Sequence, residues 1–351
     1  MKKTLIALAA VAATGAAFAQ SSVTLQGTFD PSYQNNRTTY VGGSSVTQNS
    51  IGNNAQGTSQ ITFVGVEDLG GGLKASFLYE NDFNARYDAR GVQAGSNLSS
   101  GTSTTNFGTS GGEQYLGLSG GFGSVKLGAA NTPSLTSQSG ASVFGTKIGG
   151  GFGTAQSAGR VRMNNSINYA SPSFGGLTVL GAYAFKTKVD PSNAAEIASV
   201  TDLGVNYVAG PIAAGFTNFV VANNVAGGNN KQTQNNFYGT YDLGMAKLGL
   251  GYYTDKKNNG AAAKSVDQNG YVLTANVPLN ASTNLLLSRT SKNDKTAANQ
   301  DRTINAIGLK YTMSKRTSVY ARWVDDKTKN VTAANASTGV RTVLTGIQHN
   351  F

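Results

Sequence analysis

The chain has no cysteine and only one histidine, His349. The absence of cysteine excludes disulfide bonds and thiol chemistry. One histidine cannot build a zinc site, and no serine and acid around it suggest a catalytic triad. The glycine runs at 70–72 and 149–151 also lack the Gly-Lys-Ser/Thr ending of a phosphate-binding loop. We therefore expect no enzyme, no metal and no cofactor.

Long apolar segments are missing from all of the chain except its beginning. Two lysines precede an apolar run over 5–18, which closes on Ala17-Phe18-Ala19. This pattern predicts a secretory signal peptide at 1–19, cleaved after Ala19. A transmembrane helix is the alternative, but the run is too short and too rich in small residues to span. Residues 20–351 are expected to form one domain, and this domain could cross a membrane only as a barrel.

Net charge and amino-acid composition limit the classes of partner that this chain could bind. The formal net charge is +11, or +9 once Lys2 and Lys3 are removed with the signal. No tract of lysine and arginine accompanies this charge, so we expect no nucleic acid and infer a surface or lumen that attracts anions. The 45 glycines and the mean hydropathy of -0.22 disfavour a dry core. They fit a barrel that is polar inside.

Short turns alternate with longer polar connections along the mature chain. The turns are predicted at 68–72, 120–123, 172–176, 210–211, 242–245, 278–280 and 314–316. Seven turns join fourteen strands, and two terminal strands, near 22–30 and ending at Phe351, bring the prediction to about 16. The terminal strands would pair and close the cylinder. The asymmetry of short and long connections is typical of an outer-membrane barrel.

Alternation assigns the two faces of each strand. In the last strand Val343, Ile347 and Phe351 share the apolar side, and Leu344 is an exception on the polar side. The sequence therefore predicts an all-β fold, a transmembrane antiparallel β-barrel of about 16 strands. Ordinary soluble β-packing is the alternative, which the signal peptide, the turn asymmetry and the terminal phenylalanine disfavour.

Long connections are predicted at 31–58, 83–112, 131–165, 187–199, 222–233, 255–267, 291–301 and 325–339. The third, called loop 3 below, combines several glycines with apolar residues such as Phe144 and Phe152. A deformable, partly apolar loop should fold back into the barrel lumen rather than lie in water. Simple glycine-rich flexibility is the alternative.

Several segments in order resemble Gram-negative general porins of the neisserial and Burkholderiales type. They are Glu67-Asp68-Leu69-Gly70-Gly71-Gly72-Leu73, Gly117-Leu118-Ser119-Gly120-Gly121-Phe122-Gly123, Asn164-Asn165-Ser166 with Ser171-Pro172, Tyr241-Asp242-Leu243-Gly244, Ser314-Lys315-Arg316-Thr317, and Gly346-Ile347-Gln348-His349-Asn350-Phe351. Each segment alone is weak, but together they span nearly the whole mature chain.

The resemblance implies a homotrimer of 16-stranded barrels in the outer membrane, surrounded by lipid and lipopolysaccharide. It implies that loop 3 constricts each pore and that Phe351 is the signal read by the barrel assembly machinery. Porins of this family set ion preference with arginines and carboxylates opposed across the constriction. Position by position, Arg162 corresponds to one such arginine and Glu80 to one such carboxylate.

Other positions depart from the family pattern. Gln60 and Ala129 stand where relatives often have arginine, and loop 3 has no acid between 131 and 159. Its only charge there is Lys147, with two arginines just beyond. The residues expected at the constriction are therefore Lys147, Arg160, Arg162 and Lys126, opposed by Glu80 and Glu113.

These observations predict passive diffusion of small hydrophilic solutes and ions through a water-filled channel, with weak to moderate preference for anions. The alternative is a substrate-specific uptake channel for anionic or aromatic solutes, which could use Phe144, Phe152 and the neighbouring cations. An adhesin on the same barrel is a further alternative, but the long loops carry no recognisable motif for it.

Overall fold

The computed structural model describes residues 22–83, 112–151, 162–188, 196–197, 199–225, 228–258, 264–333 and 336–351. The predicted signal peptide, Phe152 and Arg160 lie outside these residues.

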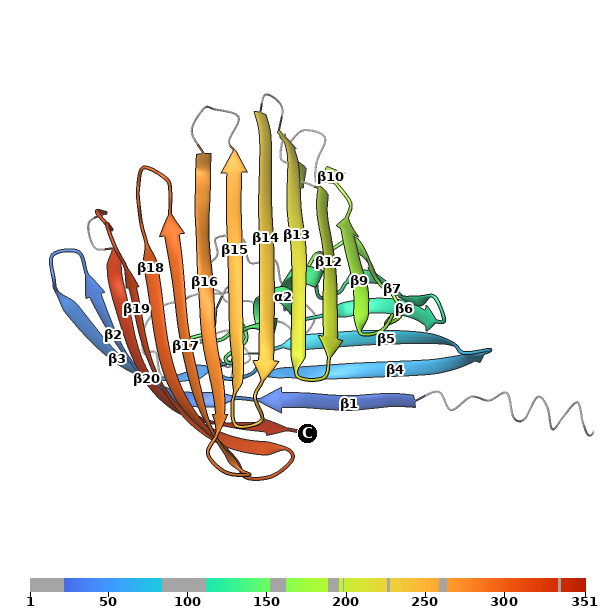
Figure 1. The fold of residues 1–351 in the computed structure, drawn as a ribbon, viewed down its shortest axis with the longest axis horizontal. Helices are drawn as coiled ribbons and strands as arrows, with labels where there is room; N and C mark the ends of the chain where they lie inside the picture. Colours follow the sequence, from blue (N-terminus) through green and yellow to red (C-terminus); the bar gives the residue numbers. More distant parts are fainter. Residues whose placement is uncertain are drawn as a thin grey trace, which may run out of the picture.

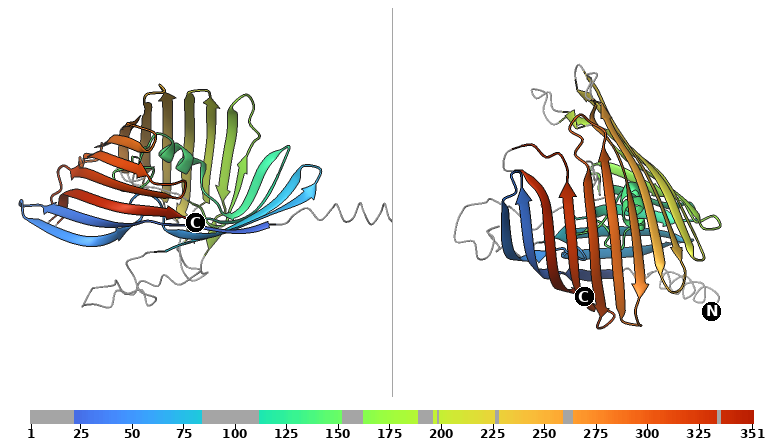
Figure 2. Two further views of the ribbon diagram at one scale, coloured as in Figure 1. Left: turned by 90° about the horizontal axis from the view of Figure 1, so that it is seen from below. Right: turned by 60° about the vertical axis from the view of Figure 1, so that its left-hand side comes forward.

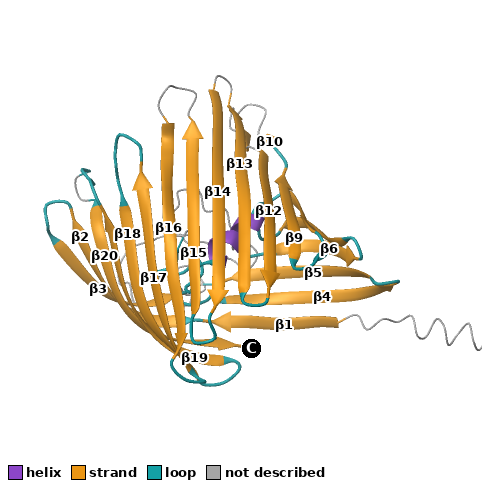
Figure 3. Ribbon diagram, in the orientation of Figure 1, coloured by secondary structure: helices purple, strands orange, loops and turns teal. Residues whose placement is uncertain are grey.

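One antiparallel sheet makes up nearly all of the described fold (Figures 1 and 3). Its strands are β1 (Ser22–Phe29), β2 (Pro31–Tyr40), β3 (Ser45–Asn53), β4 (Gln60–Gly70), β5 (Leu73–Asp82), β6 (Gln114–Gly120), β7 (Gly123–Ala129), β8 (Ser166–Ala170), β9 (Leu177–Ala184), β12 (Ser199–Ala209), β13 (Ile212–Val225), β14 (Gly228–Asp242), β15 (Lys247–Asn258), β16 (Lys264–Pro278), β17 (Thr283–Asp294), β18 (Arg302–Thr312), β19 (Thr317–Thr328) and β20 (Ser337–Asn350). Outside it are helix α2 (Pro133–Gly140) and the short pair β10 (Thr187–Lys188) and β11 (Glu196–Ile197).

The 18 strand segments form a closed barrel of 16 strands, because β1 continues into β2 and β3 into β4. Each neighbour pair is antiparallel, and the ring closes where β1 meets β20. Gly27 and Phe351 exchange two backbone hydrogen bonds of 3.0 Å at this seam. Closure leaves no open sheet edge, as a barrel predicted to cross a membrane requires, because an unpaired backbone group is costly in a hydrocarbon layer. The predicted fold class and strand number are confirmed.

All seven predicted turns join neighbouring strands at one end of the barrel. At the first of them, Gly70, Gly71 and Gly72 have φ angles of 84°, 60° and 81°. These left-handed conformations are tolerated by glycine and disfavoured for residues with a Cβ atom. The turn sequences thus fix the short side of the barrel.

The predicted long connection at 31–58 is wrong. β2 and β3 form a hairpin here, with the tip at 41–44, and β2 also pairs with β20. Polar residues such as those of 34–38 looked like a loop, but strands that extend beyond the hydrocarbon layer need no apolar face. The connection predicted at 222–233 is also mostly strand, because β13 and β14 pair up to Val225 and Gly228.

The second strand of the barrel carries an insertion that points into the lumen. Thr28 pairs with Gln60, whereas Pro31, three residues later, pairs with Asn53, seven residues earlier. Four extra residues must therefore leave the ladder, as in an enlarged β-bulge. We call residues 54–59 the lumenal bulge. Its Ala55 and Ser59 are fully buried.

The two faces of the strands are as predicted. On β20, Val343 and Ile347 are 51% and 45% exposed on the outer face, whereas Leu344 is 2% exposed inside. Leu344 packs against Ala55 of the lumenal bulge. The bulge therefore explains the one apolar residue that breaks the alternation of this strand.

Candidate functional site

Loop 3 enters the lumen through helix α2, which lies inside the barrel behind β13 and β14 (Figures 1 and 2). Thr132 caps the helix by accepting a hydrogen bond of 3.3 Å from the Leu135 amide, and Pro133 occupies the first turn. Threonine before proline is a good helix start. Because this helix is short and rich in serine, its stability must come mainly from contacts with the wall.

A buried carboxylate on the wall holds the beginning of α2. Asp202 of β12 accepts one hydrogen bond from the Ser134 amide and another from its hydroxyl, each 2.8 Å long. Both groups are fully buried. A carboxylate at a helix N-terminus also interacts favourably with the helix dipole. Asp202 therefore fixes α2 to the wall.

The tip of loop 3 is held by apolar packing on the opposite side of the lumen. Phe144 is 4% exposed and packs with Leu286, Ile304 and Val324 of β17, β18 and β19. The Arg322 guanidinium covers the ring at 4.0 Å from its centroid. Phe144 is thus enclosed on both faces and is not presented to a solute in the lumen.

The lumenal bulge meets the tip of loop 3. Arg322 donates to the carbonyl of Ala55 at 2.8 Å and also to the carbonyl of Ile148, so one guanidinium joins bulge and loop. Next to this junction, the Lys147 ammonium donates to the Thr58 hydroxyl at 2.6 Å. Loop 3 and the bulge therefore form one continuous lumenal structure.

Asp30, at the break between β1 and β2, fixes the bulge. Its carboxylate accepts hydrogen bonds of 2.7 and 2.8 Å from the amides of Gln56 and Gly57. The Tyr320 hydroxyl donates to the same carboxylate at 2.5 Å. Asp30 and Arg322 thus bind the bulge from two sides.

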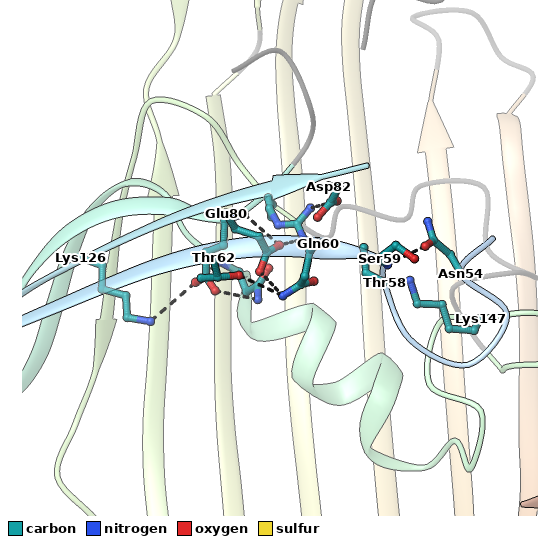
Figure 4. Close-up of polar contacts among 12 residues, drawn as sticks. Asn54, Thr58, Ser59, Gln60, Thr62, Glu80, Asp82, Lys126 and Lys147 are labelled. Carbon is teal, nitrogen blue, oxygen red and sulfur yellow. Dashed lines mark hydrogen bonds and ion pairs between the residues drawn. The ribbon is translucent and has the colours of Figure 1, made fainter. Parts of the chain in front are cut away.

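Carboxylates hold the two ends of loop 3, which pair with each other through a bridge between Asn131 and Arg162. Glu113 accepts hydrogen bonds from the Asn131 amide at 3.0 Å and from its side chain at 3.1 Å. Glu80 accepts a hydrogen bond from Arg162 at 3.0 Å. It accepts another from Gln60 at 2.8 Å (Figure 4). The ends of the loop therefore rest on charged groups of the β5–β6 wall.

The structure brings four of the predicted constriction residues together on one wall. Arg162 pairs with Glu80, and Lys126 lies 3.7 Å from Glu113. These opposite charges are neighbours on the same side of the lumen. Lys147 stands apart from them at the bulge, as Figure 4 shows, and Arg160 lies outside the described residues.

Lys147 differs from the other cations in its surroundings. Partial burial lowers the pKa of its ammonium, and the nearby carboxylates of Asp82 and Asp30 offset part of this effect. Its hydrogen bond goes to a neutral hydroxyl. Its charge is therefore less compensated than that of Arg162 or Lys126.

Three important residues were not found from the sequence: Asp202, Asp30 and Arg322. Each is an ionisable residue in or next to a strand, at a position that faces the lumen and is almost fully buried. An acid at an inward position, as in Thr201-Asp202-Leu203, was the available signal. Which loop atom each one binds could not be read from the sequence.

Within the described parts of the chain, no three or more His, Cys, Asp or Glu residues are grouped to hold a metal ion. His349 lies on an exposed part of β20, with Nδ1 2.9 Å from the Thr317 hydroxyl. In the same parts of the chain, no helix is long and apolar enough to cross a membrane.

Comparison with known proteins agrees with this architecture. Residues 4–331 match the family model for Gram-negative porins. Outer membrane porin protein 32 of Delftia acidovorans is 30% identical, over the full length of both chains. An outer membrane porin protein of Bordetella pertussis is 27% identical, over 92% of this chain and 93% of its own.

A solved structure supports the same assignment. The anion-selective porin from Comamonas acidovorans superimposes with a TM-score of 0.81 at 25% sequence identity, covering 95% of this chain and 100% of that chain. The match includes nearly the entire barrel. On this evidence, the chain belongs to the Gram-negative porin family.

Proposed function

We propose that this porin is an outer-membrane channel for passive diffusion of small hydrophilic solutes and ions, with a weak to moderate preference for anions. The observation that carries the proposal is the position of loop 3 inside the barrel, with Lys147 as its only charge before residue 160. A loop that lies in the lumen and carries no acid gives the waist a positive potential. The anion-selective porin that shares this fold also supports a preference for anions rather than cations.

The preference should be modest because two of the four cations predicted at the waist have a nearby carboxylate. Arg162 and Lys126 each have such a partner on the same wall. A paired charge attracts a passing ion less than an unpaired one, and salt screens the remainder. Lys147, together with Arg160, would then contribute most of the selectivity.

Planar-bilayer recording across a KCl gradient tests the proposal. We expect stepwise conductance and a reversal potential on the anion side, which the variant K147Q/R160Q/R162Q should move toward zero. The matched control is K315Q/R316Q, which removes two exposed cations from a turn at the short end of the barrel. An unchanged permeability ratio in the first variant would refute the assigned waist, and an absence of conductance would refute the channel.

We also propose a homotrimer that is inserted by the barrel assembly machinery through Phe351. The Phe351 ring is 44% exposed on the outer face and lies over Gly27 at the seam. An exposed terminal aromatic can be read before the barrel closes. Deleting Phe351 should lower the amount of trimer in the outer membrane, measured by electrophoresis of unheated membranes.

A further inference from the structure

The lumenal bulge is an addition to one strand of the barrel. β1 and β2 keep a single register against β20, because Thr28 pairs with Asn350 and Ser32 with Gly346. The four extra residues therefore lie entirely between β3 and β4. A strand that only completes the wall needs no insertion, and bulges in barrels commonly re-aim the chain near functional sites. The bulge is thus a feature added to a wall that would close without it.

The bulge is packed against the inner face of the wall. The Gln56 side chain donates hydrogen bonds of 3.1 Å to the Ser318 hydroxyl of β19 and to the Gln348 side-chain oxygen of β20. These contacts add to those that Asp30 and Arg322 make with the bulge backbone. A chain segment packed on the face of a sheet stands up to about 10 Å from it. The bulge therefore occupies space that would otherwise belong to the channel.

Loop 3 and the bulge together follow the wall around the lumen. α2 contacts β9, β12, β13 and β14, and the carbonyl of Ala141 accepts a hydrogen bond of 2.5 Å from Thr274 of β16. Ile148 then packs against both the apolar cluster of β17–β19 and the cluster around Ala55 of the bulge. The bulge continues this layer over β19 and β20. We call the described part of loop 3 and the bulge together the lumenal collar.

The bulge part of the collar carries no charge. Its central residues are Ala55, Gln56, Gly57 and Thr58. Thr58 is partly exposed, and its hydroxyl accepts the hydrogen bond of Lys147 at the junction with loop 3 (Figure 4). Any effect of the bulge on permeating solutes must therefore come mainly from its volume.

We infer that the lumenal bulge is a second constricting element of the channel. Together with loop 3 it sets the size limit, which is the size of the largest solute that passes. Pore diameter is one of the quantities that decide which solutes a channel admits. The inference rests on the proposed function as a diffusion channel, and it assigns the size limit and the charge preference to different residues.

Support of loop 3 is the competing role for the bulge. In that case the bulge would act only through its contacts, and its own volume would not limit solutes. The experiments below separate the two roles.

Planar-bilayer recording of the full chain and of a variant that lacks residues 55–58 tests the inference. The deletion restores a continuous ladder between the pairs Thr28–Gln60 and Pro31–Asn53 and removes no charged side chain. We expect the single-channel conductance to rise by up to about twofold, since permeation depends on pore diameter. Larger polyethylene glycols should also enter the channel of this variant. The electrophoretic shift on heating reports whether its barrel is folded.

Two further variants separate volume from contacts. A55G/Q56S/T58S keeps the length of the bulge but loses the Gln56 side-chain contacts, and it should keep the size limit of the original protein. The matched control removes the pairs Thr38–Val46 and Thr39–Ser45 near the tip of the β2–β3 hairpin. It also lacks four residues and should keep the same size limit. An increase in either variant equal to that of the deletion would overturn the inference.

Thr58→Cys provides a test that leaves the length of the bulge unchanged. The chain has no cysteine, so this variant carries a single thiol, to which benzyl methanethiosulfonate attaches an uncharged ring. We expect a stepwise fall in conductance as single channels react. Ala281→Cys, at an exposed position in a turn at the short end, is the control and should show no fall. A thiol at position 58 that does not react, or whose modification leaves the conductance unchanged, would overturn the inference.

Failure of this inference is distinguishable from failure of the proposed function. An absence of conductance in the original protein refutes the channel itself. Normal conductance in the original protein, with an unchanged size limit in the variant that lacks 55–58, refutes only the role of the bulge.

Discussion

The two ends of loop 3 and its tip are held in physically different ways. At the ends, Glu113 binds Asn131 and Glu80 binds Arg162, so charged groups on the β5–β6 wall fix the loop. At the tip, Phe144 packs into an apolar cluster on β17–β19. The charged side chains at the ends of the loop are therefore paired with each other or with polar groups, whereas Lys147 at the tip donates its hydrogen bond to a neutral hydroxyl.

The residues that hold loop 3 in position therefore differ from the residue that we propose to set the ion selectivity. Glu113 and Glu80 hold the two ends of the loop, but the charge of Arg162 is compensated there by Glu80 at 3.0 Å and by Asp82 at 3.8 Å. Lys147 is placed by the packing of its neighbours Phe144 and Ile148, and it binds only a neutral hydroxyl among the hydrogen bonds described. Apolar packing thus positions the charge that the lumen presents to ions.

The largest expected effect comes from removing the apolar support of the tip. Phe144→Ala should destabilise loop docking by about 3 to 5 kcal/mol, because it deletes a buried ring and leaves a cavity. We expect a larger and noisier single-channel conductance in planar bilayers. Val143→Ala, at a partly buried neighbour, is the control and should change conductance much less; equal effects would mean that the ring is not the main support.

Asp202→Ala should have the next largest effect. It leaves the Ser134 amide and hydroxyl without their carboxylate, at a cost of about 1 to 3 kcal/mol for buried polar groups. We expect more frequent current fluctuations, as α2 detaches from the wall. Asp202→Asn keeps one acceptor and should be intermediate, whereas indistinguishable traces for all three proteins would show that α2 does not need the carboxylate.

The charge pair at the end of the loop gives a smaller effect. Glu80→Gln removes the carboxylate nearest to Arg162 and leaves that of Asp82 at 3.8 Å. It should raise the anion preference by up to about twofold, limited by screening. Arg162→Gln should shift the reversal potential the other way. The double variant should return near the original value if the two charges act only through each other; additive shifts would contradict this.

The smallest effect is a pH dependence. Because burial lowers the pKa of Lys147, its positive charge is lost at a lower pH than that of an ordinary lysine. Anion preference should therefore decline as pH rises toward the usual lysine range. Reversal potentials of the protein and of Lys147→Gln, recorded from pH 7 upward, should converge; parallel curves would assign the titration to another group.

Much of the barrel could be predicted from the sequence, because its signals are local. Glycine-rich turns can be recognised within a few residues and predict the number of strands. The alternation of apolar and polar residues along each strand predicts which side chains face outward. The lumenal bulge was not predictable, because 54–59 is recognised only through the register of Pro31 with Asn53 and of Thr28 with Gln60. The same holds for the β2–β3 hairpin, whose strands are polar.

The candidate site was predicted only as a set of residue types. Glu80, Glu113, Lys126 and Arg162 do lie together, but as ion pairs on one wall rather than facing each other across the lumen. The role of these residues in selectivity stays a prediction. The pairing depends on where loop 3 returns to the wall, which no local pattern specifies.

The sequence by itself determined the barrel, its short end, its lipid-facing residues and the absence of acids from loop 3, because these follow from periodicity and composition. Only the tertiary structure decided which charged side chains are compensated by a neighbour and which can act on ions in the lumen. Burial of Phe144 beneath Arg322 and pairing of Arg162 with Glu80 join residues up to 178 positions apart along the chain. Electrostatic and packing energies depend on distances in space, and these exist only once the barrel has closed around its loop.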